Sequence, residues 1–148
     1  QHTLVYPAVF LYRHYIELRL KEIVQGGNWL VGKPPEFLKH HNINDLWRKC
    51  RDNLEKVDED ELRRMSETER TKYKNELNAI EEDINKFSEW DPDSTAFRYP
   101  TDKNGNPSIS DLRGINFRNL QEVVERISYS LDGICVGVSE YLNAKHEM

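Results

Sequence analysis

Apolar residues recur along most of this chain at the three- and four-residue spacing of amphipathic helices. The pattern is clearest in the last segment, about residues 116–145, where the apolar positions step by three and four without a gap. They are Phe117, Leu120, Val124, Ile127, Leu131, Ile134, Val138 and Tyr141. This spacing predicts a long final helix that buries one stripe of side chains.

The first helix is predicted over about residues 3–25, with Gly26 and Gly27 as its C-terminal stop. Its apolar residues fall on two sides, which indicates a central position in the fold. One side carries Val5, Val9, Tyr12, Ile16 and Ile23, and the other carries Leu11, Tyr15 and Leu18. The stretch NWLVGKPPEF, residues 28–37, predicts a loop because its two prolines cannot continue a helix.

Capping signals predict where two more helices begin. The second helix starts near Asn42 or Asn44, since either side chain could cap it. The acidic stretch VDEDELRR, residues 57–64, predicts a turn and a short helical piece. Ser66 and Glu69 have the spacing of a capping box, which predicts the start of a third long helix.

The stretch from Asp91 to Ser110 is the main irregular segment, with three prolines and the turn-forming pair Asn104-Gly105. Residues 97–99 and 108–109 could pair there as a short hairpin. Four helical segments and one long, proline-bounded connection predict an all-α fold. We expect a single domain over residues 1–148 that forms an antiparallel four-helix bundle.

A stripe of small residues lies beside the apolar stripe of the final helix. It consists of Ser130, Gly133, Gly137 and Ala144. Such a stripe would let another helix approach closely, either from this chain or from a partner. We favour close packing within the chain over packing with a partner.

The composition, 37% apolar and 32% charged in 148 residues, is typical of a helix-rich globule with a solvated surface. No apolar run approaches the roughly 20 residues that span a bilayer, so we expect no membrane contact and a cytoplasmic location. Both cysteines, Cys50 and Cys135, fall on apolar stripes, which indicates buried free thiols. The chain opens at Gln1 rather than Met, and we expect a trimmed chain or part of a larger parent chain.

The net charge of −5 is unevenly distributed along the chain. Residues 1–51 carry +4, residues 52–93 carry −8, and residues 94–148 carry −1. The acidic excess argues against a general affinity for nucleic-acid phosphates. The positive charge of residues 1–51 is compatible with a local basic patch in the N-terminal part.

The first candidate site lies in LYRHYIELRLKEI, residues 11–23. Arg13 and Glu17 are one helical turn apart among apolar neighbours, and His14 adjoins Arg13. We favour a border ion pair, in which the arginine stem covers apolar surface and its head stays in water. The alternative is a binding site, because an arginine held by a carboxylate beside a histidine presents a fixed cation to a phosphate or carboxylate.

Two other segments carry polar residues in comparable positions. His41 precedes the second helix, where an imidazole can cap the helix, bind an anion or transfer protons, and Asp45 lies in the first turn. For His41 we favour a plain loop residue over any single function. Arg98 and Tyr99 lie in the proline-bounded segment, where Arg98 is equally suited to a site and to an ion pair with the acidic residues 52–93.

Common catalytic and metal-binding motifs are missing from the sequence. It contains no GxSxG, no glycine-rich phosphate loop, no HExxH and no CxxC. Serine, cysteine and metal hydrolases are therefore poorly supported, and we expect neither a metal nor a cofactor.

Three short segments together resemble bacterial HEPN-like domains. They are YRHYIELRLK at residues 12–21, HNINDLW at residues 41–47 and FRYPTDKNG at residues 97–105, followed by a long final helix. The resemblance spans almost the whole chain. It implies a small helical bundle of the kind found in toxin–antitoxin, abortive-infection and other phage-defence proteins, or attached to larger proteins as an accessory module.

Catalytic HEPN ribonucleases carry an arginine followed, after four to six residues, by a histidine, and two protomers usually build one metal-independent site. No arginine of this chain has a histidine at that distance, so the family's mechanism does not carry over and enzymatic activity is left open. What the resemblance implies here is a shared set of polar residues. They are Arg13, His14, Glu17, His41, Asp45, Arg98 and Tyr99.

We hypothesise that these residues converge on a small anion-binding pocket. The leading interpretation is a HEPN-like domain, homodimeric through its long helices, that binds a nucleotide or RNA without catalysis in a bacterial defence or regulatory system. One alternative is a structural or protein-interaction bundle with no ligand. The other is a metal-independent ribonuclease in which His14 or His41 transfers protons and Arg13 or Arg98 holds the phosphate.

Overall fold

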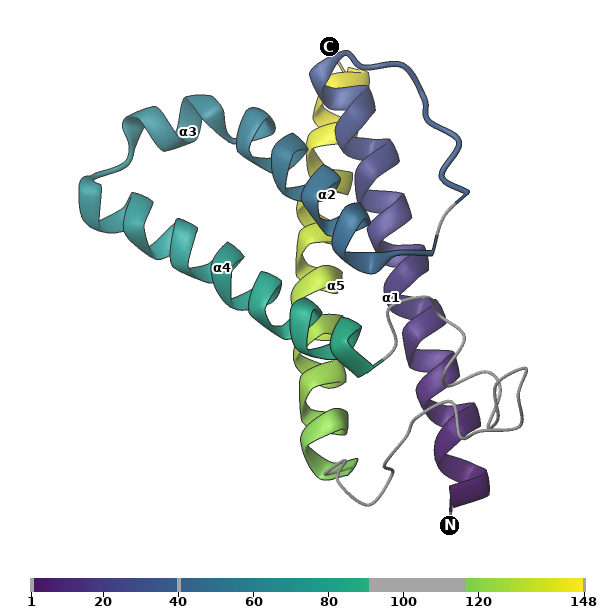
Figure 1. Ribbon diagram of the computed structural model, residues 1–148. Coiled ribbons are helices and arrows are strands. Elements are labelled where there is room, and N and C mark those ends of the chain that lie inside the picture. Colours follow the sequence, from purple (N-terminus) through teal and green to yellow (C-terminus); the bar gives the residue numbers. More distant parts are fainter. Residues whose placement is uncertain (1, 40, 91–116, 148) are drawn as a thin grey trace.

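The structure is a computed structural model that describes residues 2–39, 41–90 and 117–147, with side chains for residues 10–39, 41–89 and 118–146. Within these ranges the chain forms five α-helices and no strand (Figure 1). They are α1 (His2–Val31), α2 (Ile43–Val57), α3 (Glu59–Arg64), α4 (Glu67–Trp90) and α5 (Phe117–Glu147). The predicted all-α fold is confirmed for this part of the chain, and the predicted hairpin lies outside it.

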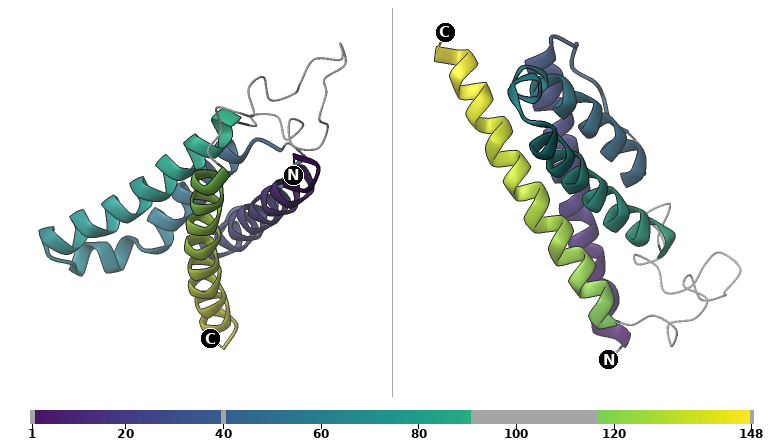
Figure 2. Two further views of the ribbon diagram at one scale, coloured as in Figure 1. Left: turned by 90° about the horizontal axis from the view of Figure 1, so that it is seen from below. Right: turned by 90° about the vertical axis from the view of Figure 1, so that its left-hand side faces the viewer.

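The two longest helices, α1 and α5, lie side by side (Figures 1 and 2). They run in the same direction, because Tyr15 contacts Asp132 and, further along both helices, Trp29 contacts Lys145. α2 packs on α1, while α4 runs against both α2 and α5 (Figure 1). None of the described helices has the length and apolar character that a membrane span requires.

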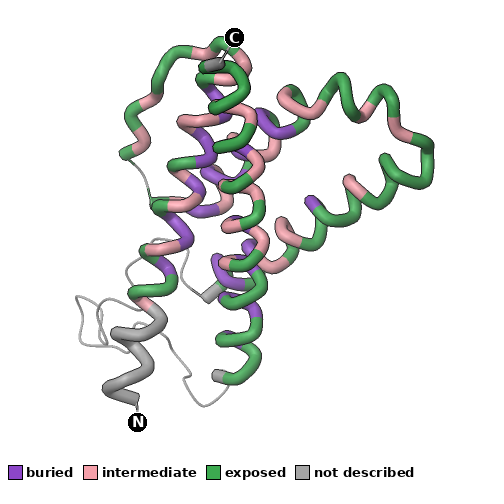
Figure 3. The backbone as a smooth tube through the Cα atoms, turned by 180° about the vertical axis from the view of Figure 1, so that it is seen from behind, coloured by how far each residue is buried: buried purple, intermediate pink, exposed green. Residues whose placement is uncertain are grey.

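α3, with the adjoining ends of α2 and α4, forms an arm that projects from the α1–α5 pair (Figure 1). The C-terminal end of α4 crosses α5, and the two helices diverge toward the α3–α4 corner (Figures 1 and 2). Buried residues concentrate where α1, α2 and α5 meet, whereas α3 and the first part of α4 are mostly exposed (Figure 3). Residues of both α4 and α5 line a groove of the molecule.

α1 is longer than the sequence predicted, because it continues through Gly26 and Gly27. A Cβ on Gly26 would lie 2.8 Å from Cγ1 of Val138 on α5, and one on Gly27 would lie 2.7 Å from Cβ of Asn53 on α2. The prediction that this pair stops the helix was wrong. The two glycines instead let α5 and α2 approach the α1 backbone closely.

The actual C-terminal stop of α1 is Gly32, so the predicted loop begins four residues later than expected. Gly32 has a φ of +79°, the left-handed conformation that glycine adopts without strain. The N–H of Lys33 donates to the carbonyl of Asn28 at 2.8 Å, which satisfies one of the last carbonyls of the helix.

The predicted caps of the next helices are confirmed. The side chain of Asn42 accepts the N–H of Asp45 at 3.1 Å and caps α2. Oγ of Ser66 accepts the N–H of Glu69 at 3.2 Å, which is the N-cap half of the predicted capping box, and it donates to the Glu69 carboxylate at 3.1 Å. The acidic stretch between them forms the short helix α3, as predicted.

The core combines apolar side chains from α1, α2, α4 and α5. The described part of the α5 stripe is buried or half-buried, as predicted. On α1 the prediction of two buried apolar sides was wrong for Leu11 and Leu18, which are 65% and 51% exposed. The side that α1 turns toward α2 instead includes Arg13 and Glu17. The largest fully buried apolar side chains are Ile16, Leu20, Ile23, Ile43, Leu46, Trp47, Ile84, Phe87, Leu120, Ile127 and Leu131.

Candidate functional site

Arg13, Glu17 and His41 form a connected polar cluster between α1 and the N-terminal end of α2. Nη2 of Arg13 donates to the backbone carbonyl of His41 at 2.6 Å, and Nη1 lies 3.7 Å from Oε1 of Glu17. The other oxygen of Glu17 lies 2.8 Å from Nδ1 of His41 and 3.0 Å from Nζ of Lys21. Two elements that are far apart in sequence therefore meet through three of the seven expected site residues.

Burial decides what this cluster can do. Arg13 is 1% exposed, so its guanidinium is enclosed. The favoured interpretation, which placed this group in water, was wrong. The Glu17 carboxylate is also buried. Burial raises its pKa, but the hydrogen bonds from His41 and Lys21 lower it by more, so the pKa lies below its ordinary value and the group stays ionised. The half-exposed imidazole of His41 is the part of the cluster that solvent reaches.

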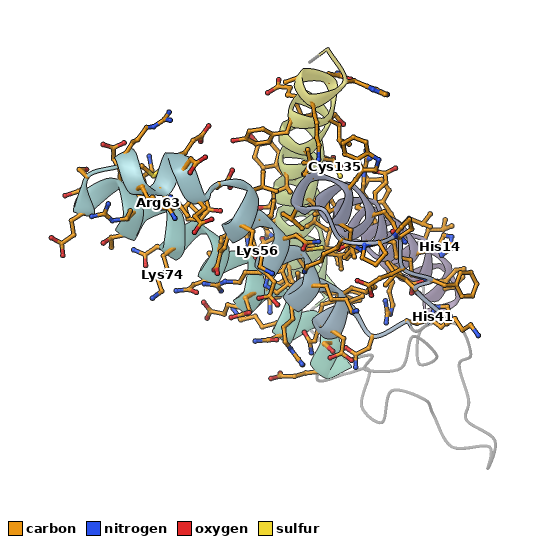
Figure 4. The ribbon with its side chains drawn as sticks, turned by 90° about the horizontal axis from the view of Figure 1, so that it is seen from above. His14, His41, Lys56, Arg63, Lys74 and Cys135 are labelled. Carbon is orange, nitrogen blue, oxygen red and sulfur yellow. The ribbon has the colours of Figure 1, made fainter. Side chains whose placement is uncertain are left out.

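His14 and Asp45 do not join this cluster through the contacts described. His14 is exposed and stacks on the ring of Phe10, with centroids 6.2 Å apart. Oδ1 of Asp45 pairs with Arg48 at 3.1 Å on the surface of α2. Figure 4 shows His14 and His41 at the same end of the molecule, on separate elements. The other two expected residues, Arg98 and Tyr99, lie outside the described residues.

A second polar network holds the α1–α2 loop against the helices. The carbonyl and N–H of Glu36 pair with the side-chain amide of Gln25, and its carboxylate accepts from Lys49 and from Asn28. The hydrogen bond from Lys49 lowers the pKa of Glu36. Asn53 joins the network, since its amide donates to Asn28 at 2.9 Å. These contacts give the loop a fixed path from α1 to the start of α2.

Neither cysteine has the environment of a reactive nucleophile. Cys50 is buried, as predicted, and its thiol donates to the carbonyl of Leu20 at 3.3 Å. Cys135 is only half-buried and contacts the carboxylate of Glu22. Burial raises the pKa of the Cys135 thiol to about 11, so the thiolate is scarce at neutral pH. No group of His, Cys, Asp and Glu in the described ranges has the arrangement of a metal site.

A large groove lies between α4 and α5, with the last turn of α2 at its back. It has a volume of about 810 Å³ and a mostly apolar lining. Its apolar and small residues are Leu54, Leu77, Ala79, Ile80, Ser130, Gly133, Ile134, Gly137 and Val138, and three tyrosines, Tyr73, Tyr129 and Tyr141, also line it. A concave apolar surface of this size is typical of a binding site.

Three of the four residues of the small stripe on α5, Ser130, Gly133 and Gly137, line this groove. A Cβ placed on Gly133 or Gly137 would meet no described atom within 4 Å. The expectation of close packing within the chain was therefore wrong for the described residues. The stripe lies open, and the backbone of α5 is accessible along it.

Polar contacts bridge the groove at two points. Oδ2 of Asp58 accepts the hydroxyl of Tyr73 at 2.7 Å. The hydroxyl of Tyr141 lies 3.1 Å from Oδ1 of Asp58 and 2.9 Å from Oε1 of Glu61, so Asp58 contacts hydroxyls of both α4 and α5. Burial, together with hydrogen bonds to carboxylates, raises the pKa of both tyrosines, which keeps the phenols protonated as donors. Elsewhere along the groove the guanidinium of Arg126 forms two hydrogen bonds to Asp83, at 3.0 and 3.1 Å.

The sequence pointed to this groove only through the glycine spacing of α5. The chain matches no family model, and no curated protein or solved structure is significantly similar to it.

Proposed function

We propose that the chain is a protein-interaction module of the HEPN-like type and that the groove between α4 and α5 binds a helical segment of a partner protein. The observation that carries this proposal is the open floor of the groove at Gly133 and Gly137. Glycines facing open space let a second helix approach the α5 backbone, and the surrounding apolar residues would be covered by that helix.

The dimensions of the groove fit a short helix. The α5 residues that line it run from Glu125 to Tyr141, which at 1.5 Å per residue is about 24 Å. The α4 residues that line it run from Tyr73 to Asp83, or about 15 Å. A partner helix of three to four turns would match these lengths.

The HEPN-like assignment draws support from the way two of the three motif segments meet. Arg13 and Glu17, in the first segment, both contact His41, in the second. The finer architecture, a four-helix bundle of α1, α2, α4 and α5, belongs to the same proposal. α4 runs antiparallel to α2 and to α5, whereas α1 runs in the same direction as α5, so the bundle is antiparallel only at α4.

A neutral amphipathic peptide tests the proposed function. The probe is a 15-residue helical peptide with leucines at i, i+3, i+4 and i+7 and glutamine on its polar face, titrated into isotopically labelled protein and followed by NMR. We expect the amide shifts to concentrate at groove residues such as Leu77, Ile134 and Val138. Shifts that spare the groove, or no binding at millimolar peptide, would contradict the proposal.

A matched pair of variants ties binding to the groove. Gly137→Leu places a side chain in the open floor and should abolish the shifts, and the empty space around Gly137 lets the variant fold. Val136→Leu is the control, because Val136 is exposed on the same helix but does not line this groove. Peptide binding that survives Gly137→Leu would place the interaction elsewhere.

A second candidate function, binding of a nucleotide or RNA at the His41 end, is favoured by one observation. The imidazole of His41 is half-exposed and is held by the buried Glu17 carboxylate, so it has a defined position at the surface. This candidate would retain the predicted homodimer and the role in a bacterial defence or regulatory system. A thermal-shift screen of ATP, GTP, NAD and short RNA against wild type and His41→Ala tests it, and a ligand that stabilises both equally would exclude His41.

A further inference from the structure

The charges around the α4–α5 groove narrow the choice of partner, and the inference drawn from them rests on the proposed function. Among the described residues, four carboxylates and one guanidinium line the groove. The carboxylates are Asp58, Glu76, Asp83 and Glu125, and the guanidinium is that of Arg126. The carboxylates come from the α2–α3 junction, from α4 and from α5, so they border the apolar floor on more than one element. From this we infer that the occupant of the groove is a basic amphipathic helix, with leucine-like residues on one face and Lys or Arg on its flanks.

The groove keeps an excess of negative charge when the ion pair between its own residues is taken into account. Arg126, the one cation in the described lining of the groove, is held by two hydrogen bonds to Asp83, so these two groups largely offset each other. Glu76 on α4 and Glu125 on α5 stand on the two walls, and both are exposed. A helix lying between these walls would have acidic groups on either side, which favours flanking cations and disfavours flanking carboxylates.

The three tyrosines of the groove add a second preference for cations. The hydroxyls of Tyr73 and Tyr141 are engaged by the Asp58 carboxylate, so their rings and not their polar ends remain for a ligand. Tyr129 is 84% exposed at the edge of the groove. The electron-rich face of a tyrosine attracts an ammonium or guanidinium group, and the effect adds to that of nearby carboxylates.

The same charges disfavour a second copy of this chain as the occupant. The chain has a net charge of −5, and α4 is among its most acidic parts. If two copies met through their grooves, the carboxylates of one would approach those of the other. Like charges at an interface weaken association, so the groove selects against its own copy.

Three matched peptides test the inference. They share the leucine face of the neutral probe and carry Lys, Gln or Glu at the flanking positions, and their dissociation constants are measured by fluorescence anisotropy at 50 and 300 mM NaCl. We expect the Lys peptide to bind about tenfold or more tightly than the Glu peptide at low salt. The difference should shrink at high salt, because the groove carboxylates are solvent-exposed.

Charge variants locate the effect on the groove walls. Glu76→Gln and Glu125→Gln should each weaken the Lys peptide about threefold at low salt and leave the Gln peptide unchanged. Glu82→Gln is the control, since Glu82 is exposed on α4 but does not line the groove. If Glu82→Gln and Glu76→Gln weakened binding of the Lys peptide equally, the effect would come from the net charge of the protein and not from the groove. That result would overturn the inference.

The outcomes separate the inference from the proposed function. If all three peptides bind equally and Gly137→Leu abolishes their binding, the groove is a docking site but not one for basic helices. If none binds, both proposals fail. A concentration-dependent dimer of wild type that Gly137→Leu dissociates would identify a second copy as the occupant and overturn the basic partner.

Discussion

Nδ1 of His41 lies 2.8 Å from the Glu17 carboxylate, while the backbone carbonyl of the same histidine accepts a 2.6 Å hydrogen bond from Arg13. His41, which precedes the N-cap of α2, is thus held at two points by residues that lie one turn apart on α1. Because Arg13 and Glu17 are buried, these bonds form in an environment where water competes little. The cluster fixes where the loop ends and where α2 begins.

Removing the buried cation should destabilise the fold. In Arg13→Ala the His41 carbonyl loses its donor and the Glu17 carboxylate loses a neighbouring positive charge. Breaking a buried ion pair on one side typically costs about 3–5 kcal/mol, and we expect the lower part of that range because Lys21 and His41 still contact Glu17. Urea unfolding measures the change in the free energy of unfolding.

Arg48→Ala provides the comparison for that experiment. Arg48 pairs with Asp45 on the surface of α2 and its side chain is 70% exposed. Surface pairs of this kind contribute about 0–1 kcal/mol. A loss in Arg13→Ala no larger than the loss in Arg48→Ala would show that the cluster does not hold the loop.

Glu17 should make stability depend on pH in the acidic range. Its pKa in the folded protein lies below the ordinary value of 4.5, so the unfolded chain takes up a proton first as the pH falls. The stabilisation is therefore fully present above about pH 4.5 and is lost as the pH drops through the folded pKa. The free energy of unfolding of wild type should exceed that of Glu17→Gln by about 1–3 kcal/mol at pH 7, and by less at pH 3.

Urea unfolding of both proteins from pH 7 to pH 3 checks this dependence. Glu82→Gln, at an exposed position of α4, serves as the reference for general effects of charge on acid stability. If the difference between wild type and Glu17→Gln stayed constant over the whole range, Glu17 would not be the group responsible.

Local signals in the sequence were enough to predict the helices and most of their ends. The caps at Asn42 and Ser66 depend on side chains within three residues of the helix start, so their spacing is readable directly. The apolar stripe of α5 was readable because it repeats over many turns. The directions and crossings of the helices could not be predicted from the sequence, because they depend on contacts between distant segments.

The errors came from residues whose role depends on a distant neighbour. Gly26 looks the same in sequence whether it ends a helix or makes room for Val138, which lies more than a hundred residues away. Arg13 was placed at the wet border because a lone sequence does not show that the carbonyl of His41 would meet it in the core. The groove was missed except for its glycines, because it arises from the divergence of α4 and α5.

The glycines of α1 and α5 should respond to alanine in opposite ways. In Gly27→Ala the new Cβ would lie 2.7 Å from Asn53, a buried side chain in a hydrogen-bonded network, so we expect a loss of about 1–3 kcal/mol. In Gly133→Ala the Cβ meets open space in mid-helix, so we expect a gain of up to about 1 kcal/mol. Thermal and urea unfolding of both variants would show the opposite signs, and a destabilised Gly133→Ala would mean that the groove floor is covered.

The two tyrosines that share Asp58 should be energetically coupled. Tyr73→Phe and Tyr141→Phe each remove one hydroxyl from the carboxylate that joins α4 and α5, and each should cost about 1 kcal/mol. The cost of the double variant should differ from the sum of the two single costs, because both hydroxyls contact the same carboxylate.

A double-mutant cycle by urea unfolding at pH 7 measures that coupling, and a second series at high pH separates its electrostatic part. The pKa of Tyr73 is raised in the folded protein, so its contribution is complete below the ordinary value of 10 and declines as the pH rises above it. The advantage of wild type over Tyr73→Phe should therefore shrink above about pH 10. An advantage that grows with pH would mean that the phenol ionises more readily in the fold than in the unfolded chain, which is incompatible with a hydroxyl donating to Asp58.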